Sequence, residues 1–166
     1  MRLFPTTLVL AAAIPLAHGQ TFAQPVREVD RDARASLHGS CTVGVVPGGS
    51  DATGLCSFTG PDGASRPGPP QGKFLVLEEA SATCTRASGD GLASLAIGNT
   101  LGQSLRFLPL STQGTENGFT RMAAFTYGRT YYRPLQSITA RLRLAAFATQ
   151  HASCFVLFSG HLVDAQ

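Results

Sequence analysis

The densest group of side chains that could bind a ligand lies around Gly128. It comprises Arg121, Tyr127, Arg129, Tyr131, Tyr132 and Arg133. Arginine forks recognise carboxylates and phosphates, and tyrosine rings can stack on sugars. The same amphipathic side chains also cover exposed sheet edges without any ligand. The group is a candidate ligand-binding surface with edge protection as the alternative, and Arg141 and Arg143 would extend it if their strand lay beside it.

Glu78 and Glu79 are the obvious pair of carboxylates. Neighbours on a regular strand point to opposite faces, so the two cannot jointly flank one bond as an acid and a base. We expect Glu78 to be partly buried in a structural contact with an Arg or a backbone amide. Glu79 should be solvated.

Ser159, His161 and Asp164 together supply a hydroxyl, an imidazole and a carboxylate. On one strand, the side chains of Ser159 and His161 would lie roughly 6.5–7 Å apart, too far for a hydrogen bond. The G-x-S-x-G elbow of serine hydrolases is missing. We therefore assign no catalytic residue. A small secreted hydrolase with an atypical site, near His161 or near Tyr127–Arg133, is the alternative function.

Phosphate-binding and metal-binding patterns are also missing from the sequence. It contains neither G-x-x-x-x-G-K-[ST] nor G-x-G-x-x-G. Asp30, Asp32 and Asp51 do not form the alternating acidic loop that calcium requires. We expect no cofactor and no metal.

The N-terminus has the order of a secretory signal peptide. Met1 and Arg2 give a positive start, and an apolar run covers residues 3–17. Small residues follow, which predicts cleavage after Gly19, with Ala23 as a weaker site. The run is shorter than the roughly 20 residues that cross a bilayer. We expect a periplasmic or secreted protein with no membrane span after cleavage.

Four cysteines follow this leader: Cys41, Cys56, Cys84 and Cys154. An even number of cysteines in an exported chain favours disulfides. Successive cysteines are 15, 28 and 70 residues apart, without the close pairs of a metal site. Three pairings are possible. We favour Cys41–Cys56, which would close a Gly/Pro-rich loop, and Cys84–Cys154, which would join two long strands.

The distribution of charge gives no reason to expect a nucleic-acid ligand. Of thirteen Lys and Arg residues, twelve remain after the leader, against ten Asp and Glu. The resulting charge of +2 is not gathered into the basic stripe that nucleic-acid binding requires. A cell-surface glycan or a protein is a more suitable partner.

Short β-type runs separated by turn residues dominate the rest of the chain. Residues 20–39 are polar and predict a flexible lead-in, and residues 40–166 predict one domain. The alternation predicts an all-β fold, a single antiparallel β-sandwich of about eight strands with jelly-roll-like connections. The expected strands are 41–46, 55–58, 73–86, 92–97, 104–108, 119–127, 137–146 and 152–163.

Two of these strands show which side chains should share a face. In 137–146, strict alternation places Ile138, Ala140, Leu142 and Leu144 inside. In 73–86, the same rule places Val76, Glu78, Ala80 and Cys84 on one face and Leu75, Leu77 and Glu79 on the other.

Three motifs resemble those of a group of small exported bacterial all-β proteins. The group has a G-K-x-L-V-x-E-x-x-S-A strand, a central L-P-L and a closing S-G-x-L-V-D strand. The first motif matches at Gly72, Lys73, Leu75, Val76, Glu78, Ser81 and Ala82. L-P-L is Leu108–Leu110, and the last motif matches at Ser159, Gly160, Leu162, Val163 and Asp164. The resemblance implies an exported all-β protein and carries over no catalytic residue.

These observations together predict an exported, non-enzymatic β-sandwich protein. It would act as a structural or adhesive module, or as a ligand-binding module, in the periplasm or outside the cell. The leader, the cysteines and the lack of an assembled catalytic group support this function over the hydrolase.

Overall fold

The computed structural model describes residues 36–60 and 62–164, and this part of the chain is all-β. The expected leader (1–19) and most of the expected lead-in (20–39) lie outside the described residues. None of the described residues forms a helix that could span a membrane. The strands are β1 (Leu37–Val45), β2 (Asp51–Thr59), β3 (Ser65–Arg66), β4 (Lys73–Ala87), β5 (Leu92–Asn99), β6 (Arg106–Phe107), β7 (Leu110–Glu116), β8 (Phe119–Tyr132), β9 (Ile138–Leu144) and β10 (Ala152–Asp164).

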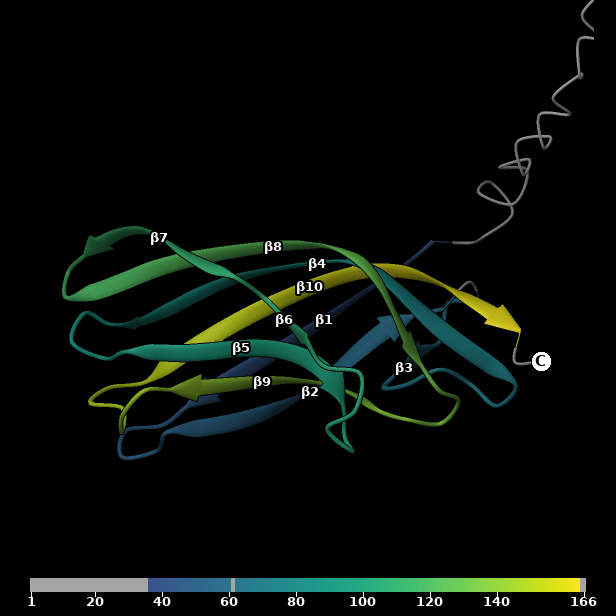
Figure 1. The fold of residues 1–166 in the computed structure, drawn as a ribbon, viewed down its shortest axis with the longest axis horizontal. Helices are drawn as coiled ribbons and strands as arrows, with labels where there is room; N and C mark the ends of the chain where they lie inside the picture. The colour runs from purple at the N-terminus through teal and green to yellow at the C-terminus, as the bar shows by residue number, and fades with distance from the viewer. Residues whose placement is uncertain (1–35, 61, 165–166) are drawn as a thin grey trace, which may run out of the picture.

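Hydrogen bonding joins the strands into one antiparallel sheet, in the order β6-β5-β9-β2-β1-β10-β4-β8-β7, with β3 beside β2. The sheet curls, so that β8, β4, β10 and β1 form one half and β5, β9 and β2 the other (Figure 1). Both halves contribute to a single hydrophobic core. The all-β class and the antiparallel pairing are thus confirmed, in an arrangement between a sandwich and a half-open barrel.

The core follows from two-residue alternation along the strands. In β9, Ile138, Ala140, Leu142 and Leu144 are all buried, as expected. Cys154, Val156 and Phe158 of β10 face the same core. An apolar side chain that is moved from water to such a core contributes about 1.5–3 kcal/mol. Burial of one face of each long strand is therefore the main stabilising term.

The observed strands cover all eight that were expected and add β3 and β7. β1 begins at Leu37, three residues before the expected start of the domain. The largest difference concerns Gly128, which lies just beyond the end of the expected strand 119–127. It lies inside β8, with a φ of 146° that favours glycine, and the strand continues to Tyr132.

Both expected disulfides are present. Cys41 pairs directly with Cys56 across β1 and β2, and Cys84 pairs with Cys154 across β4 and β10. The four strands β2, β1, β10 and β4 are consecutive in the sheet. One disulfide therefore links β2 to β1, and the other links β10 to β4. Such a crosslink typically contributes about 2–4 kcal/mol.

A β-bulge at Glu78 interrupts β4. Ser159 of β10 pairs with Glu79, and the next residue, Gly160, pairs with Leu77, so that Glu78 is extra. The register between β4 and β8 shifts at the same place. A Cβ on Gly160 would lie 2.1 Å from the carbonyl oxygen of Val76, so this close approach requires glycine.

The bulge changes which side chains share a face. Leu75 and Leu77 are buried in the core together with Ala80, Ala82 and Cys84. The expected faces of residues 73–86 were therefore wrong, because strict alternation places these two groups on opposite sides. One extra residue reverses the alternation beyond it.

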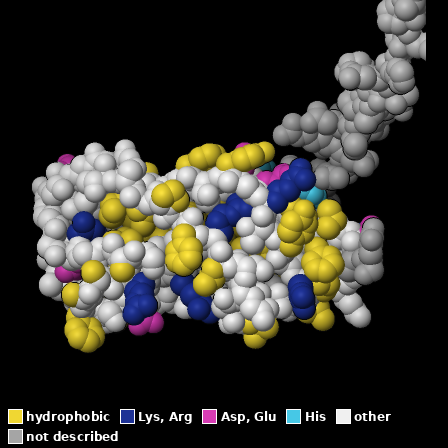
Figure 2. Space-filling view, viewed as in Figure 1, with side chains coloured by type: hydrophobic (Ala, Val, Ile, Leu, Met, Phe, Trp, Pro, Cys, Tyr) yellow, Lys and Arg dark blue, Asp and Glu magenta, His cyan; other side chains and the backbone are white. Residues whose placement is uncertain are grey.

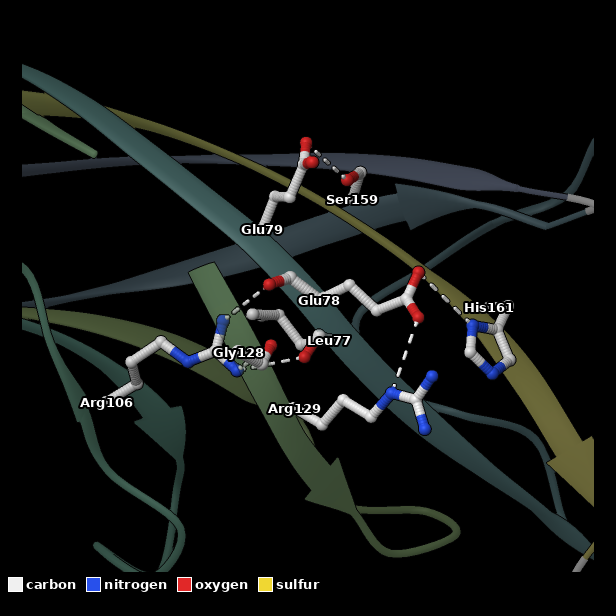
Figure 3. A network of polar contacts seen from close by, with 8 residues as sticks. All are labelled: Leu77, Glu78, Glu79, Arg106, Gly128, Arg129, Ser159 and His161. Atoms are coloured by element: carbon white, nitrogen blue, oxygen red, sulfur yellow. Dashed lines mark hydrogen bonds and ion pairs between the residues drawn. The ribbon is translucent and has the colours of Figure 1, made fainter. Parts of the chain in front are cut away.

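Arg106 holds the bulge from the core side. The side chain extends from β6, which pairs with β5, to the carbonyls of β4 and β8 (Figure 3). Its guanidinium donates to the carbonyl oxygens of Glu78 at 3.1 Å, Leu77 at 3.0 Å and Gly128 at 2.5 Å, and its Nε donates to Thr130 Oγ1 at 2.9 Å. Carbonyls at the bulge and beside it thus have a charged donor.

The same residue closes one end of the curled sheet. β6 lies at one edge of the sheet and β7 at the other. Residues 106–110, here called the crossing segment, therefore carry the chain from β5 to β8. Because Arg106 bonds to β4 and β8 as well, it fastens the β6 edge to the opposite half of the sheet.

We predict that Arg106→Met lowers the free energy of unfolding by on the order of 3 kcal/mol, because three carbonyls lose a charged donor. Arg106→Lys should recover part of this loss, since an ammonium keeps the positive charge but lacks the several fixed N–H donors of the guanidinium. Urea unfolding followed by circular dichroism measures both.

Arg121→Met is the matched control. Arg121 lies on β8 and makes only an exposed contact with Glu116, at 3.5 Å. Such a pair contributes at most about 1 kcal/mol. An equal loss in the Arg106 and Arg121 variants would contradict the bracing role of Arg106.

Candidate functional site

The candidate site is the solvent-facing side of β10, β4 and β8, here called the outer face. Strand register places Ser159, Glu79 and Tyr127 side by side in one row across these strands. His38 of β1 stands next to Ser159 at the end of that row. Polar and aromatic groups from four strands thus meet on one surface.

A second row, beside the first, is more apolar. Leu157, Ser81 and Phe125 are direct neighbours across β10, β4 and β8. Leu157 and Phe125 are both exposed. The outer face therefore combines an apolar strip with an adjacent polar strip.

A shallow hollow of about 220 Å³ lies where the two rows meet. Its walls include His38, Glu79, Ser81, Phe125, Leu157 and Ser159. The space corresponds to roughly seven water molecules. It offers a carboxylate, hydroxyls and an imidazole next to an aromatic ring.

Glu78 makes the structural contact that the sequence predicted. Its carboxylate lies 3.8 Å from Arg129 Nε and 3.5 Å from His161 Nδ1. His161 is only 5% exposed, whereas Arg129 is exposed. Side chains from three adjacent strands, β8, β4 and β10, thus meet in one polar contact at the bulge.

Glu79 makes a separate contact, accepting a hydrogen bond from the hydroxyl of Ser159 at 3.4 Å. The expectation that Glu78 and Glu79 point to opposite faces was wrong, because the bulge turns both toward solvent. Their carboxylates nevertheless point away from each other (Figure 3). Each is therefore engaged with a different strand neighbour rather than facing one shared substrate position.

The structure brings together only part of the predicted ligand-binding group. Tyr127, Arg129 and Tyr131 alternate along the outer face, and the tyrosines are 69% and 54% exposed. Arg121 is on the same strand but contacts Glu116 near the β7–β8 turn. Arg133 is exposed just after β8 ends.

Three other residues lie elsewhere. Tyr132 is 0% exposed and belongs to the core, so it cannot contact a ligand on the surface. Arg141 and Arg143 are on β9, which pairs with β2 and β5 rather than with β8. They therefore do not extend the outer face.

Sequence reasoning missed His38, Ser81 and Phe125 as neighbours of this site. Each comes from a different strand, and the register that aligns them depends on long-range pairing. Two-residue alternation along the expected strand 152–163 puts Leu157 on the face opposite Cys154, and this is the local signal that the sequence offers for the site.

Tyr132 links the two sides of the curled sheet from within. Its hydroxyl donates to the carbonyl oxygen of Ile97 on β5, at 3.5 Å. Burial raises the pKa of Tyr132 to about 12, although the nearby Arg106 charge acts in the opposite direction. The folded state therefore favours the neutral phenol.

This shift predicts a loss of stability at high pH. The pKa of Tyr132 in the folded protein lies above its unfolded value of about 10. The stability that the neutral phenol contributes is therefore complete below pH 10 and is lost as pH rises toward 12. Between pH 9 and pH 11 the wild type should lose about 1 kcal/mol more than Tyr132→Phe. Urea unfolding at both pH values measures the difference, and equal losses in the two proteins would contradict it.

No protein family, curated protein or solved structure matches the chain. Within residues 36–60 and 62–164, no three His, Cys, Asp or Glu side chains gather as a metal site would need. What the outer face can do therefore follows from its own geometry. That geometry offers exposed aromatic rings, hydrogen-bonding groups beside them and a shallow hollow.

Proposed function

We propose that this is an exported, non-enzymatic module that binds a glycan on its outer face. The observation that carries the proposal is the pair Tyr127 and Tyr131, both exposed on the same face of β8 with Arg129 between them. Four residues along a strand span about 13 Å. Two rings at this spacing suit an extended ligand with several sugar units.

The neighbouring groups fit the same ligand class. Sugars present hydroxyls at their edges and C–H groups on their faces. Glu79, Ser159 and His38 supply acceptors and donors beside Phe125 in the hollow. An aromatic ring next to hydrogen-bonding groups matches both parts of a sugar. The shallow shape suits binding along a surface rather than enclosure.

Hydrolysis is less well supported than binding. The Ser159 hydroxyl donates to Glu79, and the His161 ring lies against Glu78. The hydroxyl and the imidazole are thus each engaged with a different carboxylate. Nucleophilic catalysis requires a base that accepts the proton of the hydroxyl and a third group that orients the base.

Export is supported by the leader and by the cysteines. Disulfides persist in oxidising compartments and are rare in the cytosol. Both pairs lie on directly opposed strand positions and are buried in the core. A chain built around two such crosslinks suits the periplasm or the exterior of the cell.

We predict that the mature protein binds members of an array of oligosaccharides and peptidoglycan fragments. For the best member, Tyr127→Ala and Tyr131→Ala should each raise Kd about tenfold, because each removes one stacking ring. Calorimetric titration of the purified variants measures this effect.

Phe147→Ala is the matched control, since Phe147 is 72% exposed but lies between β9 and β10. It should leave Kd unchanged. Failure to bind any array member, or equal losses in all three variants, would refute glycan binding on this face.

We also predict that the protein recovered after expression with its own leader begins at Gln20 and contains no free thiol. Intact mass spectrometry before and after reduction should show loss of residues 1–19 and a gain of four hydrogens. A retained leader would refute export, whereas unchanged mass on reduction would refute the two disulfides.

A further inference from the structure

A second hollow, here called the seam groove, lies where the curled sheet is open between β5 and β8. Its volume is about 550 Å³, which is within the range of small-molecule sites. The crossing segment (residues 106–110) contributes to its wall. Figure 2 shows hydrophobic side chains recessed between these two strands.

The lining of the seam groove is largely apolar and carries no charged side chain among the described residues. Its hydrophobic residues include Leu92, Leu95, Leu108, Leu110 and Met122. Ser94 and Thr126 supply hydroxyls, and none of the described side chains that line the groove is charged. Met122 is flexible and polarisable, so it can adapt to ligands of irregular shape. A charged ligand group would lose its hydration here without gaining a partner.

The groove is elongated along the strands. Its lining runs from Leu92 to Leu95 on β5, about 10 Å, and from Met122 to Thr126 on β8, about 13 Å. This shape suits an extended alkyl chain better than a compact ring system.

A peptide strand does not fit the same place. β6 pairs with β5 only at Ala96 and Ile97, and Leu108 donates to the Leu95 carbonyl at 2.9 Å. Only residues 92–94 of that edge lack a neighbouring strand among the described residues, and their register with β9 is itself shifted. Three residues at an irregularity form too short an edge for strand addition.

We propose that the seam groove binds an acyl chain, with the polar end of the ligand in solvent at the open mouth. Binding in the groove does not depend on the outer face, because the two sites share no lining residue. The protein would then hold an apolar ligand in a compartment where free acyl chains are poorly soluble.

The test uses the mature disulfide-bonded protein and displacement of the fluorescent probe N-phenyl-1-naphthylamine. Linear alkanols and fatty acids from six to fourteen carbons are the competitors. Each added methylene should lower Kd about fourfold until the groove is filled. Affinity that does not change with chain length would overturn the proposal.

Two variants locate the site. Thr126→Asp places a charge in the lining, on the face of β8 opposite exposed Phe125, and should weaken binding at least tenfold, while Gln113→Asp adds the same charge on exposed β7 outside the lining. Met122→Trp should weaken binding by filling the groove, and its circular dichroism must match that of the wild type. Equal affinities for the wild type and for both groove variants would overturn the proposal.

Two further measurements distinguish a free acyl chain in the seam groove from the other possible occupants, which are a bilayer lipid and a second copy of the protein. Flotation with phosphatidylcholine vesicles distinguishes chains taken from a bilayer from free chains, and either source supports an acyl ligand. Analytical ultracentrifugation tests whether a second copy covers the groove. A dimer that probe binding does not dissociate, and that Thr126→Asp does dissociate, would overturn ligand binding in favour of self-association.

Discussion

The arrangement of both surfaces depends on the bulge at Glu78 and on the guanidinium that holds it. Arg106 donates hydrogen bonds to the carbonyls of Leu77, Glu78 and Gly128, at the place where the register of β4 is irregular. A buried carbonyl without a donor costs about 1–3 kcal/mol, so a bulge in the interior of a sheet needs such a partner. Because Arg106 belongs to the opposite edge of the sheet, the same hydrogen bonds fix the curl. Local irregularity and overall shape are therefore coupled through one side chain.

That coupling has different consequences on the two sides of the sheet. On the solvent side, the extra residue turns Glu78 and Glu79 to the same face, where they contact Arg129 and Ser159. On the inner side, Arg106 fastens one end of the seam. The seam groove remains between β5 and β8 beside the crossing segment. A polar, aromatic surface and an apolar groove thus arise from one sheet that does not close completely.

The structure explains why particular residues occur in the three sequence motifs. The first and last motifs lie on β4 and β10, which pair from Lys73–Asp164 onward, and these two side chains are 2.6 Å apart. Gly160 permits close contact with Val76, and Glu78 is the bulged residue. L-P-L is the part of the crossing segment that reaches β7. Many of the motif positions are thus explained by strand pairing and by the bulge, without any catalytic role.

The sequence by itself determined the all-β class and most strand positions, and it favoured, among three possible pairings, the two disulfides that are present. These depend on local alternation and on the position of each cysteine along a strand, and both properties are local. It also identified Tyr127, Arg129 and Tyr131 as exposed candidates and gave Glu78 a structural contact. Only the tertiary structure decided that Glu78 and Glu79 share a face, that Tyr132 is buried and that His38 and Phe125 border the same hollow. One bulge reverses the alternation of a strand, and register between distant strands depends on long-range pairing that no local pattern contains.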